Sequence, residues 1–541
     1  MKTYEGLARR RLPSAVLAPI FVGLLALLAA CDVGPRVESA APALQPAAPP
    51  AAAGAAVAPS AQSAAPAATP AAAKPAPQAP LKLLKVAPVD GHIGDSFTIA
   101  GEGLPANAQV QFFWATMDGT FDTKVHLETV EFYERKFAAK RIPLGRATTD
   151  AQGAMSARLT VPDDYGEIHD IYAAVDGQDV ARGGYRVLPE FSVSPLEGPI
   201  GTPIVIRARG LGWKNWESTW AVSWDNKYAG FISAVTTRGT AVAVVRAAGP
   251  IGKRTIDVWH AGQTVPYLNW EQSPQAHIPI FQYTFNVTKD AGPPQAAVEW
   301  PEGAVPAIDP VAPRTTANVS ALSRAVQIGA TIAPPAGPIL SRATLRGTAL
   351  PPNAPVELFW MTARGSRTSG LGWALAELPL GKAVTDQAGV LALDFQVPDD
   401  LGGWHTVKVV QGDKILAEVP YLIQPSLVGV TPTRVKVGET FKVQIKGVGW
   451  TELDNIYTVV YDNSYVGFAC GFNSNGDVTV NLRASGVPGT HLVDLYPAIY
   501  QGHGKPPWLY DTPQLTALRD HPGLALGYRL PIFRLAIEVI E

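Results

Sequence analysis

Apolar and polar residues alternate with a period of two over most of the chain beyond about residue 82. Segments such as "QVQFFW", "SARLTV", "TPIVIRA" and "TFKVQIKG" place β-branched and aromatic residues at alternate positions, between breaks of Gly, Pro or Asp-Asn. This period is typical of strands with one buried face. Turn residues recur every ten or so positions, which predicts antiparallel β-sandwiches. The stretch 125–140 is the one candidate for a helix.

One phrase of the sequence occurs twice. "SWDNKYAGF" begins at Ser223 and "VYDNSYVGF" at Val460, and the spacing of 237 residues holds over some fifty positions. Asp and Asn tolerate the left-handed backbone of tight turns, so each phrase is predicted to be a hairpin that turns at its Asp-Asn pair. A calcium site at Asp225 or Asp462 is not expected, because six to eight oxygen ligands are needed and few are nearby.

The repeat extends to either side with unequal insertions. Pro143 matches Pro379, and "LPANAQVQFFW" from Leu104 matches "LPPNAPVELFW" from Leu350. The changing offsets place about ten extra residues of the first copy within 120–141 and about fifteen of the second around 502–528. Each copy is therefore a pair of modules. The expected order is A1 (81–190), A2 (191–287), a Pro/Ala-rich linker (288–324), B1 (325–424) and B2 (425–541).

The A2 sequence carries a family resemblance. "VSPLEGPIGTPIVIRARGLGW" from Val193, then "AVSWDNKYAGF" and "RAAGPIGKRTIDVW", resemble the immunoglobulin-like IPT/TIG domain. B2 has the related "VGVTPTRVKVGETFKVQIKGVGW" but lacks the first glycine and the serine. A1 and B1 are similar to bacterial extracellular immunoglobulin-like modules. The resemblance implies an all-β chain of four tandem sandwiches that serve as structural or binding modules at a cell surface.

The N-terminus reads as an export signal. Lys2 and Arg9–Arg11 precede an apolar run that ends in "LLAAC" at Cys31, and this ending resembles the lipobox of bacterial lipoproteins. The expectation is a signal peptide over 1–30 and lipidation, including palmitate, at Cys31. An uncleaved membrane anchor and a twin-arginine signal are the alternatives. Asp32 resembles an inner-membrane retention signal, and the choice of membrane stays open.

Residues 31–80 consist mostly of Ala and Pro, with a few Ser and Gln. Such a composition cannot bury a core, so a disordered tether is expected. Together with the lipid, it predicts a protein of the bacterial cell envelope, anchored to a membrane and facing the periplasm or the exterior.

Charge and cysteine content argue against a nucleic-acid-binding protein and against a protein stabilised by disulfides. Lys and Arg number 44 against 46 Asp and Glu, which gives no basis for a nucleic-acid partner. The chain has only two cysteines, so no disulfide framework is available. With Cys31 lipidated, Cys470 is expected to be a small buried residue.

No catalytic motif, metal-ligand spacing or phosphate-binding loop is present, so no enzyme activity, metal or cofactor is expected. The acid pairs Asp163-Asp164 and Asp399-Asp400 follow Val-Pro and precede Gly, as turn residues do. The leading hypothesis is an adhesive, scaffolding or assembly role through contacts with another envelope protein.

Aromatic loops before the last strands of A2 and B2 are the candidate ligand-binding segments. The residues singled out are Tyr267, Trp270 and Glu271 in "PYLNWEQSPQ", and Trp508, Tyr510 and Asp511 in "PPWLYDTPQL". They suggest a polysaccharide-binding alternative, since aromatic rings can stack on sugars, or else a plug that covers a sheet edge. An enzyme alternative places its site in the 501–529 insertion, at His503, Asp511, Asp520 and His521.

Overall fold

The structure, a computed structural model, describes residues 80–125, 130–214, 217–261, 264–272, 279–301, 329–366, 372–500 and 511–541. Residues 78–541 form one compact unit. The predicted signal peptide, Cys31 and the tether lie outside the described residues. None of the described residues belongs to a helix long and apolar enough to cross a membrane.

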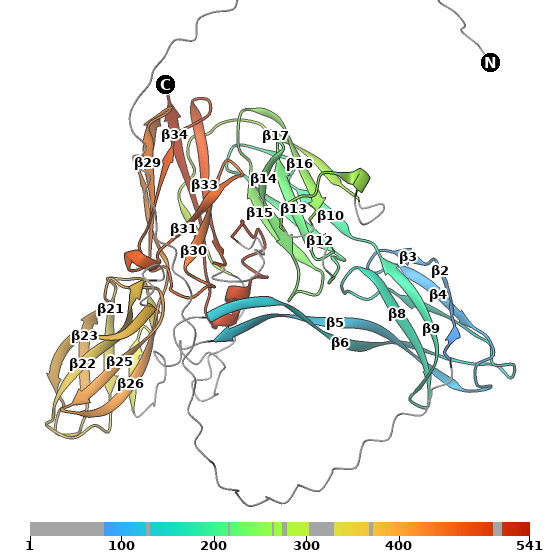
Figure 1. Ribbon diagram of the computed structural model, residues 1–541, viewed down its shortest axis with the longest axis horizontal. Helices are drawn as coiled ribbons and strands as arrows, with labels where there is room; N and C mark the ends of the chain where they lie inside the picture. The colour runs from blue at the N-terminus through green and yellow to red at the C-terminus, as the bar shows by residue number, and fades with distance from the viewer. Residues whose placement is uncertain are drawn as a thin grey trace, which may run out of the picture. The chain divides into compact units, whose positions relative to one another are not determined.

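Each module consists of one three-stranded sheet and one larger sheet (Figure 1). In A1 the larger sheet has the order β1(Lys82–Leu83), β9(Gln178–Val187), β8(Glu167–Val175), β5(Gln109–Val125), β6(Val130–Thr148), with β3(Asp90–Gly91) also on β9. The smaller sheet is β2(Lys85–Ala87), β4(Ser96–Gly101), β7(Met155–Thr160). In A2 the sheets are β10(Glu190–Ser194), β12(Pro203–Arg209), β15(Ala241–Arg246) and β11(Glu197–Gly198), β17(Phe281–Val287), β16(Gly252–His260), β13(Thr219–Trp224), β14(Lys227–Ser233), with η1(Trp270–Gln272) between β16 and β17.

The second copy repeats this arrangement. B1 has β19(Ala330–Ala333), β21(Arg342–Gly347), β24(Leu391–Gln396) and β20(Ala336–Gly337), β26(Lys414–Ile423), β25(Gly403–Gln411), β22(Pro355–Ser366), β23(Gly372–Val384). B2 has β27(Ser426–Thr431), β29(Thr440–Lys446), β32(Val478–Arg483) and β18(Ala297–Glu299), β34(Ile532–Ile540), β33(Gly489–Ala498), β30(Ile456–Tyr461), β31(Ser464–Cys470), with β28(Arg434–Lys436) also on β34. Two short 3₁₀ helices, η2(Phe472–Ser474) and η3(Pro522–Leu526), complete B2. The predicted all-β fold of tandem immunoglobulin-like sandwiches is confirmed.

The cores follow the alternation in the sequence. In β4 every second side chain, Phe97 and Ile99 among them, is buried between the sheets of A1. In contrast, β13 is buried at every position, and β33 at every position after its first. A strand of a free sandwich has one solvent face, so β13 and β33 must be covered on both faces. A single apolar cluster accordingly joins the A2 core to Val460, Leu492 and Tyr496 of B2.

The duplicated phrase forms the predicted hairpins. Asp225 and Asn226 connect β13 to β14 with φ of 49° and 61°, and Asp462 and Asn463 connect β30 to β31 with φ of 47° and 57°. Two consecutive left-handed residues define the type I′ turn, whose twist matches that of the flanking strands.

Two expectations from the sequence are wrong. The segment around 130–140 is part of strand β6 rather than a helix, because it pairs with β5 along its whole length. Cys470 is exposed, because it ends β31, which is the edge strand of its sheet.

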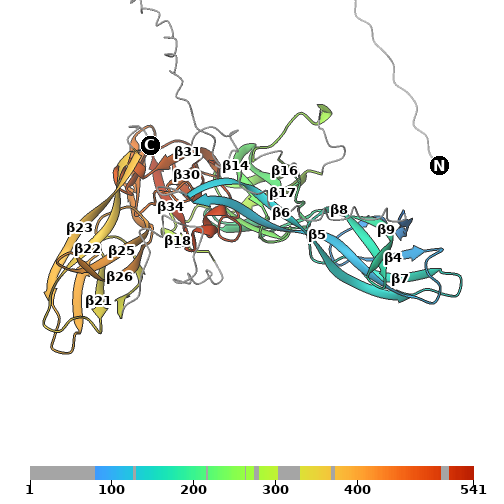
Figure 2. The ribbon, with the colours of Figure 1, turned by 60° about the horizontal axis from the view of Figure 1, so that its bottom comes forward.

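The first copy's insertion extends the β5–β6 hairpin into a long two-stranded arm (Figure 2). Only Gln111–Trp114 of β5 also pair with β8, so the rest of the arm leaves the sandwich. The arm lies against A2, where a Cβ at Gly119 would lie 2.3 Å from the carbonyl oxygen of Val235. Beyond this point, Phe121 packs on the cluster that contains Leu526 of B2.

The second acid of each predicted acid pair has a structural role. Asp164 and Asp400 are fully buried outside the strands and accept a hydrogen bond from Trp114 Nε1 and Trp360 Nε1, each at 3.0 Å. Arg238 and Arg364 also contact these carboxylates, at 3.3 and 3.1 Å. In each copy the buried carboxylate therefore holds a core tryptophan.

Replacing Asp400 by Ala is expected to destabilise the protein, because the Trp360 indole N–H is then buried without an acceptor. The expected loss in the free energy of unfolding is roughly 1–3 kcal/mol, measured by denaturant titration. Asp399→Ala is the matched control, since that half-exposed carboxylate only pairs with Lys446. Its expected cost is below about 1 kcal/mol. Equal losses in the two variants would contradict the assignment.

Candidate functional site

The two copies meet at their duplicated hairpins. Strands β14 and β31, which are equivalent in the repeat, lie against each other. Their equivalent tyrosines, Tyr228 and Tyr465, meet edge to face with ring centroids 6.3 Å apart. The predicted hairpins therefore also serve as the contact between copies.

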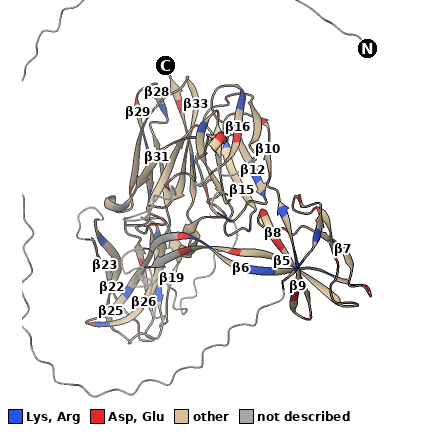
Figure 3. Cartoon of the chain, turned by 45° about the vertical axis from the view of Figure 1, so that its right-hand side comes forward, with Lys and Arg blue, Asp and Glu red and all other residues tan. Residues whose placement is uncertain are grey.

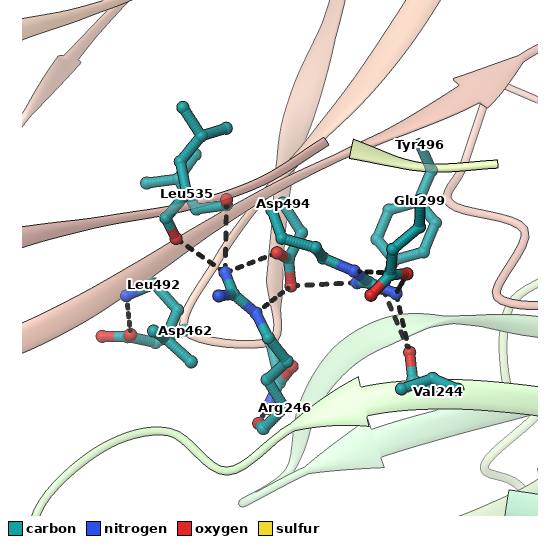
Figure 4. A network of polar contacts seen from close by, with 11 residues as sticks. Val244, Arg246, Glu299, Asp462, Leu492, Asp494, Tyr496 and Leu535 are labelled. Atoms are coloured by element: carbon teal, nitrogen blue, oxygen red, sulfur yellow. Dashed lines mark hydrogen bonds and ion pairs between the residues drawn. The ribbon is translucent and has the colours of Figure 1, made fainter. Parts of the chain in front are cut away.

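A buried ionic network fixes this contact (Figure 4). Arg246 of β15 reaches Asp494 of β33 at 2.5 Å, and it donates to the carbonyl oxygen of Leu535 at 2.7 Å. Arg534 pairs with the same Asp494 at 3.2 Å and with Glu299 of the linker strand β18 at 2.9 Å. Since β18 also pairs with β34, the beginning of the linker is part of the B2 sheet.

A cavity of about 420 Å³ opens beside this contact, between equivalent turns of A2 and B2. It is lined by the pair Asp225–Arg254 at 3.1 Å and by the equivalent pair Asp462–His491 at 2.5 Å. Burial lowers the pKa of His491, but the adjacent Asp462 carboxylate outweighs it, and the net shift is upward. In both pairs the carboxylate is thus matched by a cationic or basic side chain across the turn.

The second copy's insertion packs on A2. Phe231 N donates to Pro513 O and Leu515 N to Phe231 O, each at 2.8 Å, which adds the insertion to the edge of β14. The Asp520 carboxylate accepts hydrogen bonds from Ser233 Oγ at 2.5 Å and from Val235 N at 3.0 Å. It also accepts from Thr236 N and Oγ1 at 2.9 and 2.7 Å.

Two residues of the enzyme hypothesis lie in this docked segment. His521 caps η3 by accepting from Gly523 N at 2.9 Å. Asp520 and His521 are 1% and 2% exposed, so neither side chain is accessible to a substrate. His503 lies outside the described residues. No group of three or more metal-ligating side chains occurs in the described part of the chain.

The predicted loop of A2 connects β16 to β17. Tyr267 is half-buried and donates to the carbonyl oxygen of Gln272 at 3.4 Å, while Glu271 is exposed in η1 with Trp270 before it. In B2, Trp508 and Tyr510 lie outside the described residues. Asp511 is half-buried, burial raises its pKa, and its carbonyl oxygen accepts from Tyr465 at 2.8 Å. A ligand-binding role of these residues stays a prediction.

The candidate functional site is a cavity of about 590 Å³ between A1 and A2, here called the first junction. Glu167 and Ile168 of β8 line it from A1. Glu217, Trp220 and the two ends of the predicted loop line it from A2, at His260, Pro279 and Phe281. Trp220 is held by Phe281 at 5.7 Å between ring centroids and by an edge-on contact with His260 at 5.3 Å.

Among the described residues of the first junction, three polar atoms are buried without a hydrogen-bond partner: Glu217 Oε2, Trp220 Nε1 and His260 Nε2. Burial raises the pKa of Glu217 and lowers that of His260 to about 4, so the imidazole is neutral. Each unsatisfied buried group costs about 1–3 kcal/mol, and such groups call for a specific explanation. A bound molecule that supplies a donor and acceptors would satisfy them.

The equivalent space between B1 and B2, the second junction, is filled by the chain itself. Leu526, Tyr528 and Leu530, here called the plug, pack in one cluster with Leu422 and Leu453, with Trp404 against it. The Tyr528 hydroxyl donates to Asp454, which stands at the repeat position of Glu217. Burial raises the pKa of Tyr528 well above its usual value, so it remains a donor.

The sequence predicted about fifteen extra residues in the second copy but did not reveal the first junction. Trp220, His260 and Glu217 match Tyr457, Pro497 and Asp454 at the repeat spacing of 237 residues. The sequence contained one indication of the site: of the two equivalent loops before the last strands of A2 and B2, only the B2 loop carries an insertion. Acidic and basic residues are interspersed over the described strands, so charge did not mark the site (Figure 3).

Asp494→Ala is expected to lower the stability of the contact between copies by about 3–5 kcal/mol, because Arg246 and Arg534 lose a shared buried carboxylate. Denaturant titration followed by hydrogen exchange on β13 and β33 measures the loss. Asp257→Ala at the equivalent position of the first copy is the control, since Asp257 only accepts from Gln282 at 3.1 Å. A control as damaging as Asp494→Ala would contradict the role of the network.

Acid is expected to loosen the plug segment through His521. Burial lowers the pKa of His521 to about 3, so the unfolded chain takes up the proton first as the pH falls below 6.5. The contribution of neutral His521 to the free energy of unfolding is complete above pH 6.5. It decreases toward pH 3 by up to about 1.4 kcal/mol per pH unit. His521→Asn retains a capping acceptor but does not titrate. Between pH 7 and 4.5 the free energy of unfolding, measured by denaturant titration, should fall by about 2 kcal/mol more in the wild type than in the variant. Parallel curves of this free energy against pH would refute the assignment.

No protein-family model matches the chain, and no curated protein matches it. Similar solved structures include a Salmonella α2-macroglobulin mutant at 9% identity, covering 83% of this chain and 30% of that one with a TM-score of 0.17. An ICAM-5 D1–D4 ectodomain fragment matches at 11% identity, 85% and 99% coverage and a TM-score of 0.16. Invasin, a bacterial integrin-binding protein, matches at 12% identity, 76% of both chains and a TM-score of 0.17. The chain thus spans less than a third of the macroglobulin, and scores this low give no basis for transferring a function.

Proposed function

We propose that this chain is a lipid-anchored protein of the bacterial cell envelope that binds another envelope protein and has no catalytic role. The observation that carries the proposal is the first junction, where a cavity with three unpaired buried polar atoms stands in place of a space that the second copy fills itself. A protein that leaves one of two equivalent sites open is suited to an adhesive, scaffolding or assembly function.

The anchor rests on the sequence around Cys31. An export signal that ends in "LLAAC" supports lipidation with palmitate, and the Ala/Pro-rich segment 31–80 supports a tether. The IPT/TIG-like features of A2 and B2 fit a surface module. The modules would then stand clear of the membrane with their junctions accessible.

Cys31→Ser is expected to abolish lipidation, because the thiol is the attachment point. In cells fed labelled palmitate, the wild type should carry the label and sediment with membranes, and the variant should do neither. A variant that stays in the membrane without label would instead support an uncleaved membrane anchor.

Ile168→Trp is expected to prevent capture of the partner at the first junction. Ile168 is 58% exposed, so a larger side chain there narrows the cavity without entering a core. Leu83→Trp, at an 84% exposed position of the same module, is the matched control. In a pull-down from the native envelope, the wild type and the control should each retain a stoichiometric partner protein. Ile168→Trp should retain at least tenfold less of it, which corresponds to a loss in binding free energy on the order of 1.4 kcal/mol. Equal capture by all three would place binding elsewhere.

A polysaccharide ligand is the second candidate, and a basic aromatic groove of about 630 Å³ between A1 and A2 favours it. Arg141 lies 3.9 Å over the ring of Tyr172, and Lys214 lies 5.3 Å from the ring of Trp213. In the same pull-down, enrichment of sugar without protein would support this groove, or the predicted loops at Trp270 and Trp508.

A further inference from the structure

The second junction shows which chemistry the shared architecture accepts. Tyr528 is 4% exposed, and its hydroxyl donates to the Asp454 carboxylate at the bottom of the space. Leu526 and Leu530 on either side bury their side chains in the same cluster. The occupant is thus a tyrosine between two leucines, presented by an irregular segment.

The first junction keeps the carboxylate position that receives this plug and the chain positions that follow the plug. Pro279 and Phe281 match Pro531 and Phe533, and Glu217 supplies a carboxylate at the position of Asp454. Backbone geometry is also equivalent, because Gly212 N donates to Glu217 O and Gly449 N to Asp454 O, both at 3.1 Å. The acceptor for a phenol therefore extends from the same backbone position in both copies, with the Glu217 side chain one methylene longer than that of Asp454.

The first copy does not carry the plug in its own sequence. At the offset that aligns Pro279 with Pro531, Ala276 stands where the second copy has Tyr528. Ala276 lies outside the described residues, but an alanine side chain offers no hydroxyl. The described lining also carries Trp220 Nε1 and His260 Nε2, both unpaired, where the second copy has the unpaired hydroxyl of Tyr457 and Pro497. An indole N–H in this position suits a backbone carbonyl of an extended peptide.

An anionic ligand does not fit the first junction. Glu217 and Glu167 both line it, and the cations near them are already paired: Arg186 with Glu167 at 3.1 Å, and Lys214 with Oε1 of Glu217 at 3.8 Å, which leaves Glu217 Oε2 unpaired. The raised pKa of Glu217 already reflects the cost of burying its charge. A neutral donor with apolar flanks is the complementary chemistry.

We infer that the first junction binds, in trans, a segment of the partner protein that carries a tyrosine flanked by leucine-like residues and so reproduces the chain's own plug. The tyrosine hydroxyl donates to Glu217, the apolar flanks pack on Pro279, Phe281 and Ile168, and Trp220 Nε1 donates to the segment's backbone. This inference rests on the proposed function, since it names the partner element that occupies the same site.

The test uses a fluorescent peptide with the sequence of residues 522–532, PGLALGYRLPI, titrated into the full-length chain in mild detergent and followed by polarisation. We expect saturable binding of one peptide per chain. The Phe-for-Tyr peptide and the Glu217→Ala variant should each weaken it about ten- to hundredfold, as expected for a hydrogen bond to a carboxylate. Combining the two changes should weaken it no further than either alone, which identifies the hydroxyl and the carboxylate as a pair.

Two controls separate binding at the first junction from general effects. Glu197→Ala removes an exposed carboxylate of the same module and should leave the affinity unchanged. Trp220→Phe keeps an aromatic ring in the core but removes the indole N–H together with part of the ring system, and should weaken binding severalfold. Absence of saturable binding to the wild type, or an affinity unaffected by Glu217→Ala, would overturn the inference.

Failure of the inference can be told from failure of the proposed function. If Ile168→Trp abolishes capture of the envelope partner while the peptide does not bind, the surface around Ile168, which lines both the first junction and the groove between A1 and A2, binds a protein that lacks the plug chemistry. If the peptide binds but Ile168→Trp captures the same envelope proteins as the wild type, the inferred tyrosine-binding site is correct and the proposed role in binding an envelope partner is wrong.

Discussion

The buried contact between A2 and B2 is the constraint on which the rest of the structure depends. Arg246 enters the B2 sheet and shares Asp494 with Arg534, and only close packing can supply carboxylates to both cations away from water. A buried ion pair adds little net stability but makes any other registration of the copies costly. The network thus specifies how the copies dock, while the shared apolar cluster supplies the favourable free energy.

The two unequal insertions follow from this docking. With A2 and B2 fixed, the β5–β6 arm of the first copy reaches past Val235 to the cluster around Leu526, and the insertion of the second copy adds to the edge of β14. Each insertion therefore crosses from its own copy to the other. Asp520 and His521 suggested an active site as a sequence, but Asp520 accepts hydrogen bonds from A2 and so holds this crossing in place, while His521 caps η3.

The copies diverged at the junctions between modules. In the second, Tyr528 and its leucine neighbours close the space, and Asp454 has its donor. In the first, Glu217, Trp220 and His260 retain unpaired atoms around a cavity. The chain thus contains a filled and an open form of one site, and the difference between them defines the chemistry that is missing from the open form.

Much of the fold could be predicted because it depends on local pattern. Period-two alternation determined the strands, the Asp-Asn pairs determined the hairpin turns, and the repeat spacing predicted a tandem arrangement of sandwiches. The sequence could not reveal the candidate site, because Glu217, Trp220 and His260 become a site only when β8 of A1 closes over them. It also could not show that Asp164 and Asp400 hold core tryptophans, since their partners lie on distant strands. Local propensities are encoded in neighbouring residues, whereas burial and unpaired polar atoms arise from contacts between elements far apart in the chain, which only the tertiary structure decides.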